Sequence, residues 1–197
     1  KKKIKKKITF VNNLNSNADY FQNKNINLNL IISKSGNTLE TIANANTLIK
    51  IKESNIIITE DKNSYLTNLA NKLKAEIFEH KNYVGGRYSV LSEVGMLPAE
   101  LMNLNENKFK QFNNLIKNKV LVNNLVNNVA ATLNLIKSGK YTSVILNYDE
   151  QSENFFKWYQ QLIAESLGKK STGILPIISS MPKDNHSLMQ LYLDGPK

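Results

Sequence analysis

The chain has 197 residues, of which 41% are hydrophobic, and its mean hydropathy of −0.36 fits a globular protein with one good core or two small ones. No apolar stretch is long enough to cross a bilayer, and the absence of cysteine excludes disulfides. Residues 1–7 (KKKIKKK) run into a strand-like segment without the apolar core of a secretory signal, so we expect a cytoplasmic protein with no membrane partner.

The formal net charge is +10, which raises the question of a nucleic-acid partner. Beyond residues 1–7 the lysines are dispersed among Asn and Glu, and the sequence contains no Arg-rich segment and no segment of interleaved aromatic and basic residues. Because the basic residues of a nucleic-acid-binding surface normally cluster on one element, we predict no nucleic-acid partner. We predict instead an anionic small substrate such as a phosphate ester. Residues 1–7 are interpreted as a solvated basic flank, and an RNA- or membrane-associated segment is the alternative.

From residue 7 to residue 78, apolar runs alternate with amphipathic segments, a pattern typical of parallel strands joined by crossover helices. Strands are predicted at residues 8–13, 28–33, 55–59 and 76–78, and helices at residues 38–52 and 64–74. The predicted fold class is therefore α/β.

Residues 83–104 interrupt this alternation, and helices are predicted at residues 107–117 and 119–137. Gly139 is placed to end the second of these helices. A strand at residues 141–148 and a helix at residues 152–167 then restart the pattern.

Three parts follow from these elements: an α/β unit at residues 1–104, a helical connection at residues 105–139, and the start of a second α/β unit at residues 140–197. The second unit has too few predicted strands to complete a sheet by itself. We therefore expect the chain to be an internal fragment of a longer protein.

The turn SKSGNT between a predicted strand and a predicted helix has the composition of a phosphate loop. A helix start offers unpaired N–H groups, and Gly36 lets the backbone approach a ligand closely. Three hydroxyls can donate to phosphate oxygens and one lysine adds charge; these residues are Ser33, Ser35, Thr38 and Lys34. The alternative is an ordinary helix N-cap at Asn37 or Thr38, with Glu40 reaching back as in a capping box.

Four segments resemble known sequence families. ISKSGNTLETIANA is similar to the phosphate loop of SIS sugar-phosphate isomerase domains, and VGGRYSVLSEVGMLPAEL (residues 84–101) is similar to a signature of the phosphoglucose isomerase family. QQLIAESLGK (160–169) and DNHSLMQLYLDG (184–195) resemble that family's glutamate and histidine segments. The resemblance implies three-layer αβα units with parallel sheets flanked by helices, two SIS units each partly present, and interconversion of glucose 6-phosphate and fructose 6-phosphate.

Moving a carbonyl between C1 and C2 of a sugar phosphate requires a base that transfers a carbon-bound proton through an enediol or enediolate. Glu165 is the candidate, and Gln161, four residues earlier, shares its helix face. A fixed cation near the negative charge that develops on the sugar oxygens lowers the activation barrier. Arg87, which directly follows Gly86, suits this role. A solvated glutamate and a structural arginine salt bridge are the alternatives. The resemblance implies that Glu165 is the base, Gln161 and Gly86 contact the substrate, and Arg87 stabilises the enediolate.

Ring opening of a hexose phosphate also requires a proton carrier near neutral pH, and histidine suits this task. His186 follows Asp184, a predicted N-cap, so the positive helix terminus is expected to favour its neutral form. A surface or capping histidine is the alternative. The resemblance implies that His186 opens the ring in the neighbouring subunit's site, and hence a homodimer, whereas His80 matches no motif and is interpreted as structural.

The family is longer at both ends, and its serine-rich amino-terminal loop and its carboxy-terminal catalytic lysine have no counterpart here. No metal or organic cofactor is expected, because no His, Cys or Asp cluster has ligand spacing. A non-catalytic SIS-type sensor of sugar phosphates is the alternative function. It needs the phosphate loop but neither Glu165 nor Arg87.

Overall fold

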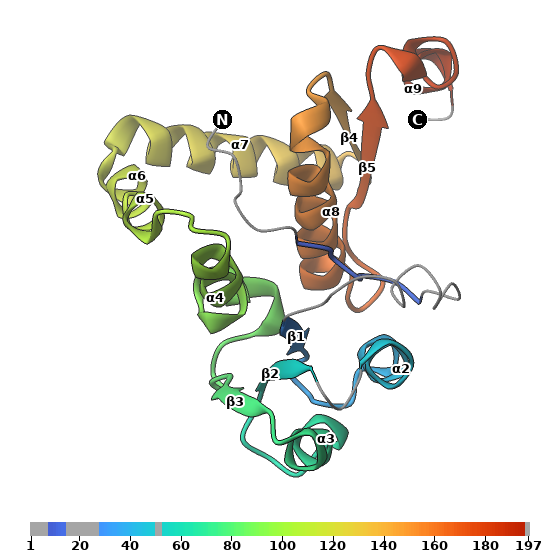
Figure 1. Cartoon of the computed structure of the whole chain (residues 1–197). Coiled ribbons are helices and arrows are strands. Elements are labelled where there is room, and N and C mark those ends of the chain that lie inside the picture. Colours follow the sequence, from blue (N-terminus) through green and yellow to red (C-terminus); the bar gives the residue numbers. More distant parts are fainter. Residues whose placement is uncertain (1–7, 15–27, 50–52, 196–197) are drawn as a thin grey trace. The chain divides into compact units, whose positions relative to one another are not determined.

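The computed structural model describes residues 8–14, 28–49 and 53–195, which belong to two compact units, Lys1–Phe112 and Asn113–Lys197 (Figure 1). The basic run at residues 1–7 and the last lysine, Lys197, lie outside the described residues. Each unit has its own sheet: three strands in the first and two in the second.

The first unit alternates strands and helices, as the apolar pattern predicted. Its elements in order are β1 (Leu28–Ile32), α2 (Leu39–Leu48), β2 (Ser54–Thr59), α3 (Tyr65–Leu73) and β3 (Glu76–Glu79). All three strands are parallel in the order β1-β2-β3, with Ile32 opposite Ile58 and Thr59 opposite Glu79. Parallel pairing follows from the crossover helices, which return the chain to the same end of the sheet each time.

Both faces of this sheet are covered. Ile57 and Ile58 are neighbours on β2, point to opposite faces, and are both 0% exposed. On one face, Ile57 packs with Leu66 and Ala70 of α3. In Figure 1, α4 (Glu93–Leu101) lies on the opposite side of the strands from α2 and α3. Parallel sheets with helices on both faces are the arrangement that the α/β prediction implied.

A 3-10 helix and short α-helices replace the alternation after β3. The 3-10 helix η1 spans Gly86–Leu91, and α4 begins after Ser92, whose hydroxyl accepts from the Val94 N–H at 3.4 Å. The first unit ends with α5 (Glu106–Lys110).

Two predicted elements differ from the structure. Residues 8–13 form no strand and have no sheet partner among the described residues, and Phe10 is 72% exposed. An apolar run forms a strand only where a neighbouring strand accepts its hydrogen bonds, so this prediction was wrong. The helix predicted at residues 107–117 is interrupted at Gln111 and Phe112, where the two units meet in sequence.

The second unit is built on two parallel strands joined by one crossover helix. Its main elements are α6 (Asn113–Lys117), α7 (Lys119–Lys137), β4 (Thr142–Asn147), α8 (Glu153–Leu167), β5 (Leu175–Ser180) and α9 (Met189–Asp194). Two 3-10 turns, η2 (Glu150–Ser152) and η3 (Lys183–Asn185), precede α8 and α9. α7 ends at Lys137 and Gly139 follows with a φ of +86°, which confirms the predicted stop.

The crossover helix is attached to the second strand of this unit. The side-chain amide of Gln160 on α8 donates to the Pro176 carbonyl of β5 at 2.7 Å. On α7, by contrast, Leu125, Val129 and Leu133 recur at helical spacing and are each more than half exposed. The second unit therefore leaves one apolar helix face uncovered within the described chain.

We predict that Leu66→Ala lowers the free energy of unfolding by about 2–5 kcal/mol, because Leu66 is 0% exposed at the centre of the first core. Leu39→Ala is the matched control, since Leu39 is also helical but 72% exposed, and it should change this free energy by less than about 0.5 kcal/mol. Urea unfolding followed by circular dichroism measures both values. Equal losses in the two variants would contradict the assignment of the core.

Candidate active site

The predicted phosphate loop leaves the carboxyl end of β1 and enters α2. The Ser33 N–H donates to the Ile58 carbonyl at 3.1 Å, which continues the ladder between β1 and β2. The chain then turns at Gly36, whose φ of +67° lies in the left-handed region. A Cβ at Gly36 would lie 2.1 Å from Ser64 Oγ, so only glycine fits this turn.

The three hydroxyls of the phosphate loop gather at this turn. Thr38 Oγ1 lies 2.7 Å from Ser33 Oγ and 3.5 Å from Ser35 Oγ, and Ser35 Oγ also accepts from the Asn37 N–H at 3.1 Å. Thr38 occupies the N-cap position of α2, yet its side chain makes no capping hydrogen bond. The alternative thus placed the N-cap correctly, but the side-chain capping bond is not formed, and an anion at the start of α2 stays a prediction.

The ammonium group of Lys34 is engaged with a different loop. Lys34 Nζ donates to the carbonyls of Val84 at 2.7 Å and Asn82 at 3.0 Å, and it lies 3.5 Å from a carboxylate oxygen of Glu60. Asn82 and Val84 belong to the segment that leads to Gly86, whereas Glu60 directly follows β2. A contact between the Lys34 ammonium and a phosphate group stays a prediction.

Gly86 and Arg87 open the 3-10 helix η1 in the loop after β3. The Ser89 hydroxyl donates to the Gly86 carbonyl at 2.7 Å, which holds the turn from its buried side. Gly86 itself is exposed, and a Cβ there would meet no described atom within 4 Å. Arg87 is half-buried, with its Nε atom inside the protein. The open side of Gly86 is compatible with close approach of a substrate to the backbone.

In the second unit, Gln161 and Glu165 lie on one exposed face of α8. The side-chain amide of Gln161 donates to Glu165 Oε1 at 2.8 Å, which confirms that residues four apart share this face. The bond limits the orientations of the Glu165 side chain, and both residues are exposed. A role of Glu165 as the base stays a prediction.

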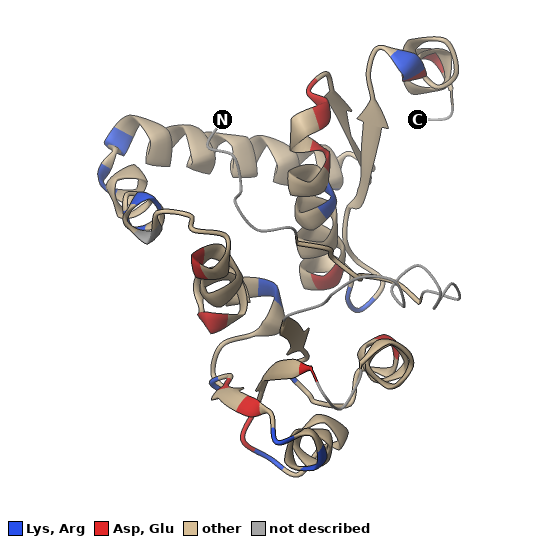
Figure 2. Ribbon diagram, viewed as in Figure 1, with Lys and Arg blue, Asp and Glu red and all other residues tan. Residues whose placement is uncertain are grey.

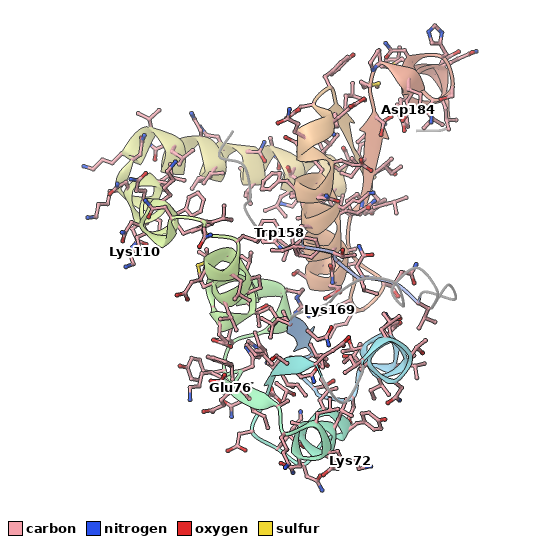
Figure 3. The ribbon with its side chains drawn as sticks, viewed as in Figure 1. Lys72, Glu76, Lys110, Trp158, Lys169 and Asp184 are labelled. Atoms are coloured by element: carbon pink, nitrogen blue, oxygen red, sulfur yellow. The ribbon has the colours of Figure 1, made fainter. Side chains whose placement is uncertain are left out.

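His186 is exposed and follows the 3-10 turn η3, at the end of β5. Asp184 lies inside this turn and does not cap a helix: its carboxylate accepts from the Ser179 hydroxyl and the Ser180 N–H, each at 2.7 Å. Figure 3 shows Asp184 where the chain leaves β5 toward α9. The predicted N-cap at Asp184 was wrong, and with it the argument that a helix terminus favours the neutral form of His186.

The candidate residues are divided between the two units. The phosphate loop, Gly86 and Arg87 belong to the first, and Gln161, Glu165 and His186 belong to the second. Lys and Arg residues are dispersed along the ribbon of both units rather than gathered on one helix or strand (Figure 2). Over residues 8–14, 28–49 and 53–195, no helix has the length and apolarity of a membrane span, and His, Cys, Asp and Glu side chains form no group of three that would hold a metal ion.

Three polar residues beside the first loops were not predicted as part of a site. Glu60 and His80 each directly follow a strand, and the carboxyl ends of parallel strands meet at one edge, which was the available signal. Glu93 contacts His80 across 13 residues of chain, and no local pattern indicates that pairing.

These features define a class of protein: an α/β protein whose parallel sheet ends in a loop of hydroxyl side chains at a helix start. The family model for phosphoglucose isomerase matches residues 1–178. The chain therefore belongs to the phosphoglucose isomerase family, as its motifs suggested.

Similar proteins agree with this assignment. The chain is 41% identical over 180 residues to the glucose-6-phosphate isomerase of Methanocaldococcus jannaschii, which covers 85% of this chain and 44% of that protein. It is 32% identical over 194 residues to the glucose-6-phosphate isomerase of Mycoplasma capricolum, with 91% and 45% covered. The chain thus spans less than half the length of the curated relatives that it matches.

Solved structures show the same fold. A hypothetical protein from Thermus thermophilus matches with a TM-score of 0.68 at 28% identity, over 85% of this chain and 44% of that one. A glucose-6-phosphate isomerase from Chlamydia trachomatis matches with a TM-score of 0.62 at 23% identity, over 85% and 37% of the two chains.

We predict that Asp184→Asn destabilises the protein at pH 7 and that the difference from wild type shrinks as the pH falls. Hydrogen bonds from Ser179 and then Ser180 lower the pKa of Asp184 below its ordinary value of 3.8. Because the folded-state pKa is depressed, the ionised carboxylate stabilises the fold above pH 3.8, and this stabilisation is lost as the pH falls through the folded-state pKa. Urea unfolding of both proteins at a series of pH values between about 7 and 3 measures the difference.

Ser179→Ala is the control, because it removes the largest contributor to the shift while leaving the carboxylate in place. The pH-dependent part of the stability should be smaller in this variant than in wild type. A difference between wild type and Asp184→Asn that stays constant from pH 7 to pH 3 would contradict the prediction.

Proposed function

We propose that the full-length protein is a glucose-6-phosphate isomerase, which interconverts glucose 6-phosphate and fructose 6-phosphate in glycolysis and gluconeogenesis. The observation that carries this proposal is the cluster of Ser33, Ser35 and Thr38 hydroxyls at the start of α2, where the helix receives no side-chain cap. Hydroxyls gathered beside a helix start that has no side-chain cap suit a phosphate dianion. Membership of the phosphoglucose isomerase family supports the choice of substrate.

The chemistry divides among three side chains. His186 moves a proton between the ring oxygen and the hydroxyl at C1 or C2, which opens the ring. Glu165, oriented by Gln161, removes the proton from one of the two carbons and returns it to the other. The Arg87 guanidinium stays protonated at any working pH and stabilises the negative charge of the intermediate. The carbonyl thus moves between C1 and C2 without an external oxidant or reductant.

The wider organisation follows from the same family. We infer two SIS-type units that are each partly present, at residues 1–104 and 140–197, joined by a helical connection at residues 105–139. The protein acts as a cytoplasmic homodimer in which His186 serves the neighbouring subunit's site, without a metal or organic cofactor and without a nucleic-acid partner. The exposed apolar face of α7 supports further covering of the second unit in the full-length assembly.

We predict that Glu165→Gln lowers kcat for fructose 6-phosphate isomerisation about 100- to 10,000-fold, because the amide cannot accept the carbon-bound proton. The full-length protein and the variant are compared in a coupled assay at saturating substrate. Glu153→Gln is the matched control, since Glu153 is an exposed glutamate on the same helix whose partner is Lys157, and its kcat should equal that of wild type.

Two other outcomes are informative. Undiminished turnover in Glu165→Gln would remove this residue as the base. Binding of fructose 6-phosphate by the full-length dimer with no turnover in wild type would overturn the isomerase proposal in favour of the sugar-phosphate sensor.

The shared-site dimer predicts complementation between two inactive variants. In a heterodimer of Glu165→Gln and His186→Ala chains, one site receives both wild-type side chains and the other receives neither. Random mixing of unfolded and refolded chains should therefore restore about a quarter of wild-type activity. Each variant refolded alone serves as the control, and a mixture no more active than these controls would contradict a histidine donated between subunits.

A further inference from the structure

We propose that His80 and Glu93 are positioning residues that hold the turn before Arg87 against the phosphate loop. The inference rests on the proposed function, because it assigns a role to this pair in the same site. The family resemblance assigns no role to His80 or to Glu93, although Glu93 lies within the signature stretch at residues 84–101.

His80 is fixed at both ring nitrogens and in its backbone. It lies directly after β3, its N–H donates to the Thr59 carbonyl at 2.8 Å, and its side chain is 0% exposed. Nδ1 is hydrogen-bonded to a carboxylate oxygen of Glu93, and Nε2 donates to the Val84 carbonyl at 3.2 Å. A fully buried imidazole with two partners has a single orientation.

Glu93 is the first residue of α4, and its carboxylate connects the His80 ring to this helix. Burial works against ionisation of Glu93, but hydrogen bonds from its own N–H and from His80 lower the pKa of the carboxyl below its ordinary value. The carboxylate at Nδ1 and the Val84 carbonyl at Nε2 thus give each ring nitrogen of His80 a partner. The contact between His80, directly after β3, and Glu93, at the start of α4, thereby joins the two ends of the loop between these elements.

The Val84 carbonyl is the point at which this pair meets the phosphate loop. It accepts from His80 Nε2 and, at 2.7 Å, from Lys34 Nζ. In the sequence, Lys34 lies between Ser33 and Ser35 of the phosphate loop. The Lys34 carbonyl accepts from the Glu60 N–H at 3.1 Å and from the Thr59 hydroxyl at 3.3 Å. One carbonyl thus connects the end of β3, the phosphate loop and the turn that carries the arginine.

The contacts at the Val84 carbonyl determine the position of Arg87 relative to the phosphate loop. Val84 precedes the Gly85–Gly86 pair, and the Tyr88 N–H closes the turn by donating to the Gly85 carbonyl at 2.9 Å. A substrate anchored by its phosphate group meets the guanidinium only if the spacing between the two loops is fixed. Misplacement of a catalytic group by about 1 Å costs on the order of 100-fold in rate. Loosening His80 should therefore reduce kcat more than it weakens phosphate binding.

The test uses Glu93→Gln in the full-length protein, a substitution that keeps the side-chain shape and an acceptor while removing the charge. His80→Phe is the second variant, which keeps a ring but no donor. Glu53→Gln is the matched control: Glu53 accepts from the Asn29 side chain at 2.8 Å at the opposite, amino-terminal end of the same sheet. Folded protein in each sample is counted by circular dichroism, so that rates are expressed per folded molecule.

We expect Glu93→Gln to lower kcat about 10- to 100-fold with a change in KM of less than about threefold, whereas Glu53→Gln matches wild type in both. Hydrogen exchange of the amides from residue 84 to residue 91, measured without substrate, should accelerate in Glu93→Gln and His80→Phe and stay unchanged in Glu53→Gln. Unchanged kcat per folded molecule, or unchanged exchange in this segment, overturns the proposal.

The exchange measurement separates this inference from the proposed function. If wild-type protein lacks isomerase activity, the proposed function fails, and exchange still reports whether the pair orders the turn before Arg87. A loss of overall stability with normal kcat in the folded fraction would indicate a purely structural pair and would overturn the positioning role.

Discussion

Parallel hydrogen bonding of β1, β2 and β3 brings three strand ends to one edge of the first sheet, and every loop of the candidate site in this unit starts there. The ladder continues one bond beyond each outer strand, from Ser33 to Ile58 and from His80 to Thr59. Crossover helices make this possible because they return the chain to the amino-terminal end after each strand. The register of the strands thus places the phosphate loop beside the turn that precedes Arg87.

The polar groups at this edge have separate tasks. At the start of α2, the Thr38 hydroxyl lies within 3.5 Å of the hydroxyls of Ser33 and Ser35. The charged Lys34 joins two loops through backbone carbonyls. Burying His80 would be unfavourable without partners, but hydrogen bonds at both ring nitrogens offset the loss of water. The contacts of Lys34 and His80 therefore join these loops through polar groups.

The second unit shows how much of a site depends on local geometry alone. The contact between Gln161 and Glu165 requires only one helical turn of α8, and it is formed even though the sheet of this unit has two strands. The exposed apolar face of α7 agrees with a chain that spans less than half the length of its relatives. The contact between these two candidates is therefore formed within α8 alone.

The sequence by itself determined the α/β alternation, the glycine turn at Gly36 and the shared helix face on α8, because apolar period and local backbone preference act over a few residues. It failed at residues 8–13, where a strand-like pattern has no neighbouring strand, and at Asp184, whose carboxylate binds the preceding strand end rather than a helix start. Only the tertiary structure decided that Lys34 reaches Val84 and that His80 meets Glu93. These contacts join residues distant in the chain, and strand register and loop closure bring them together.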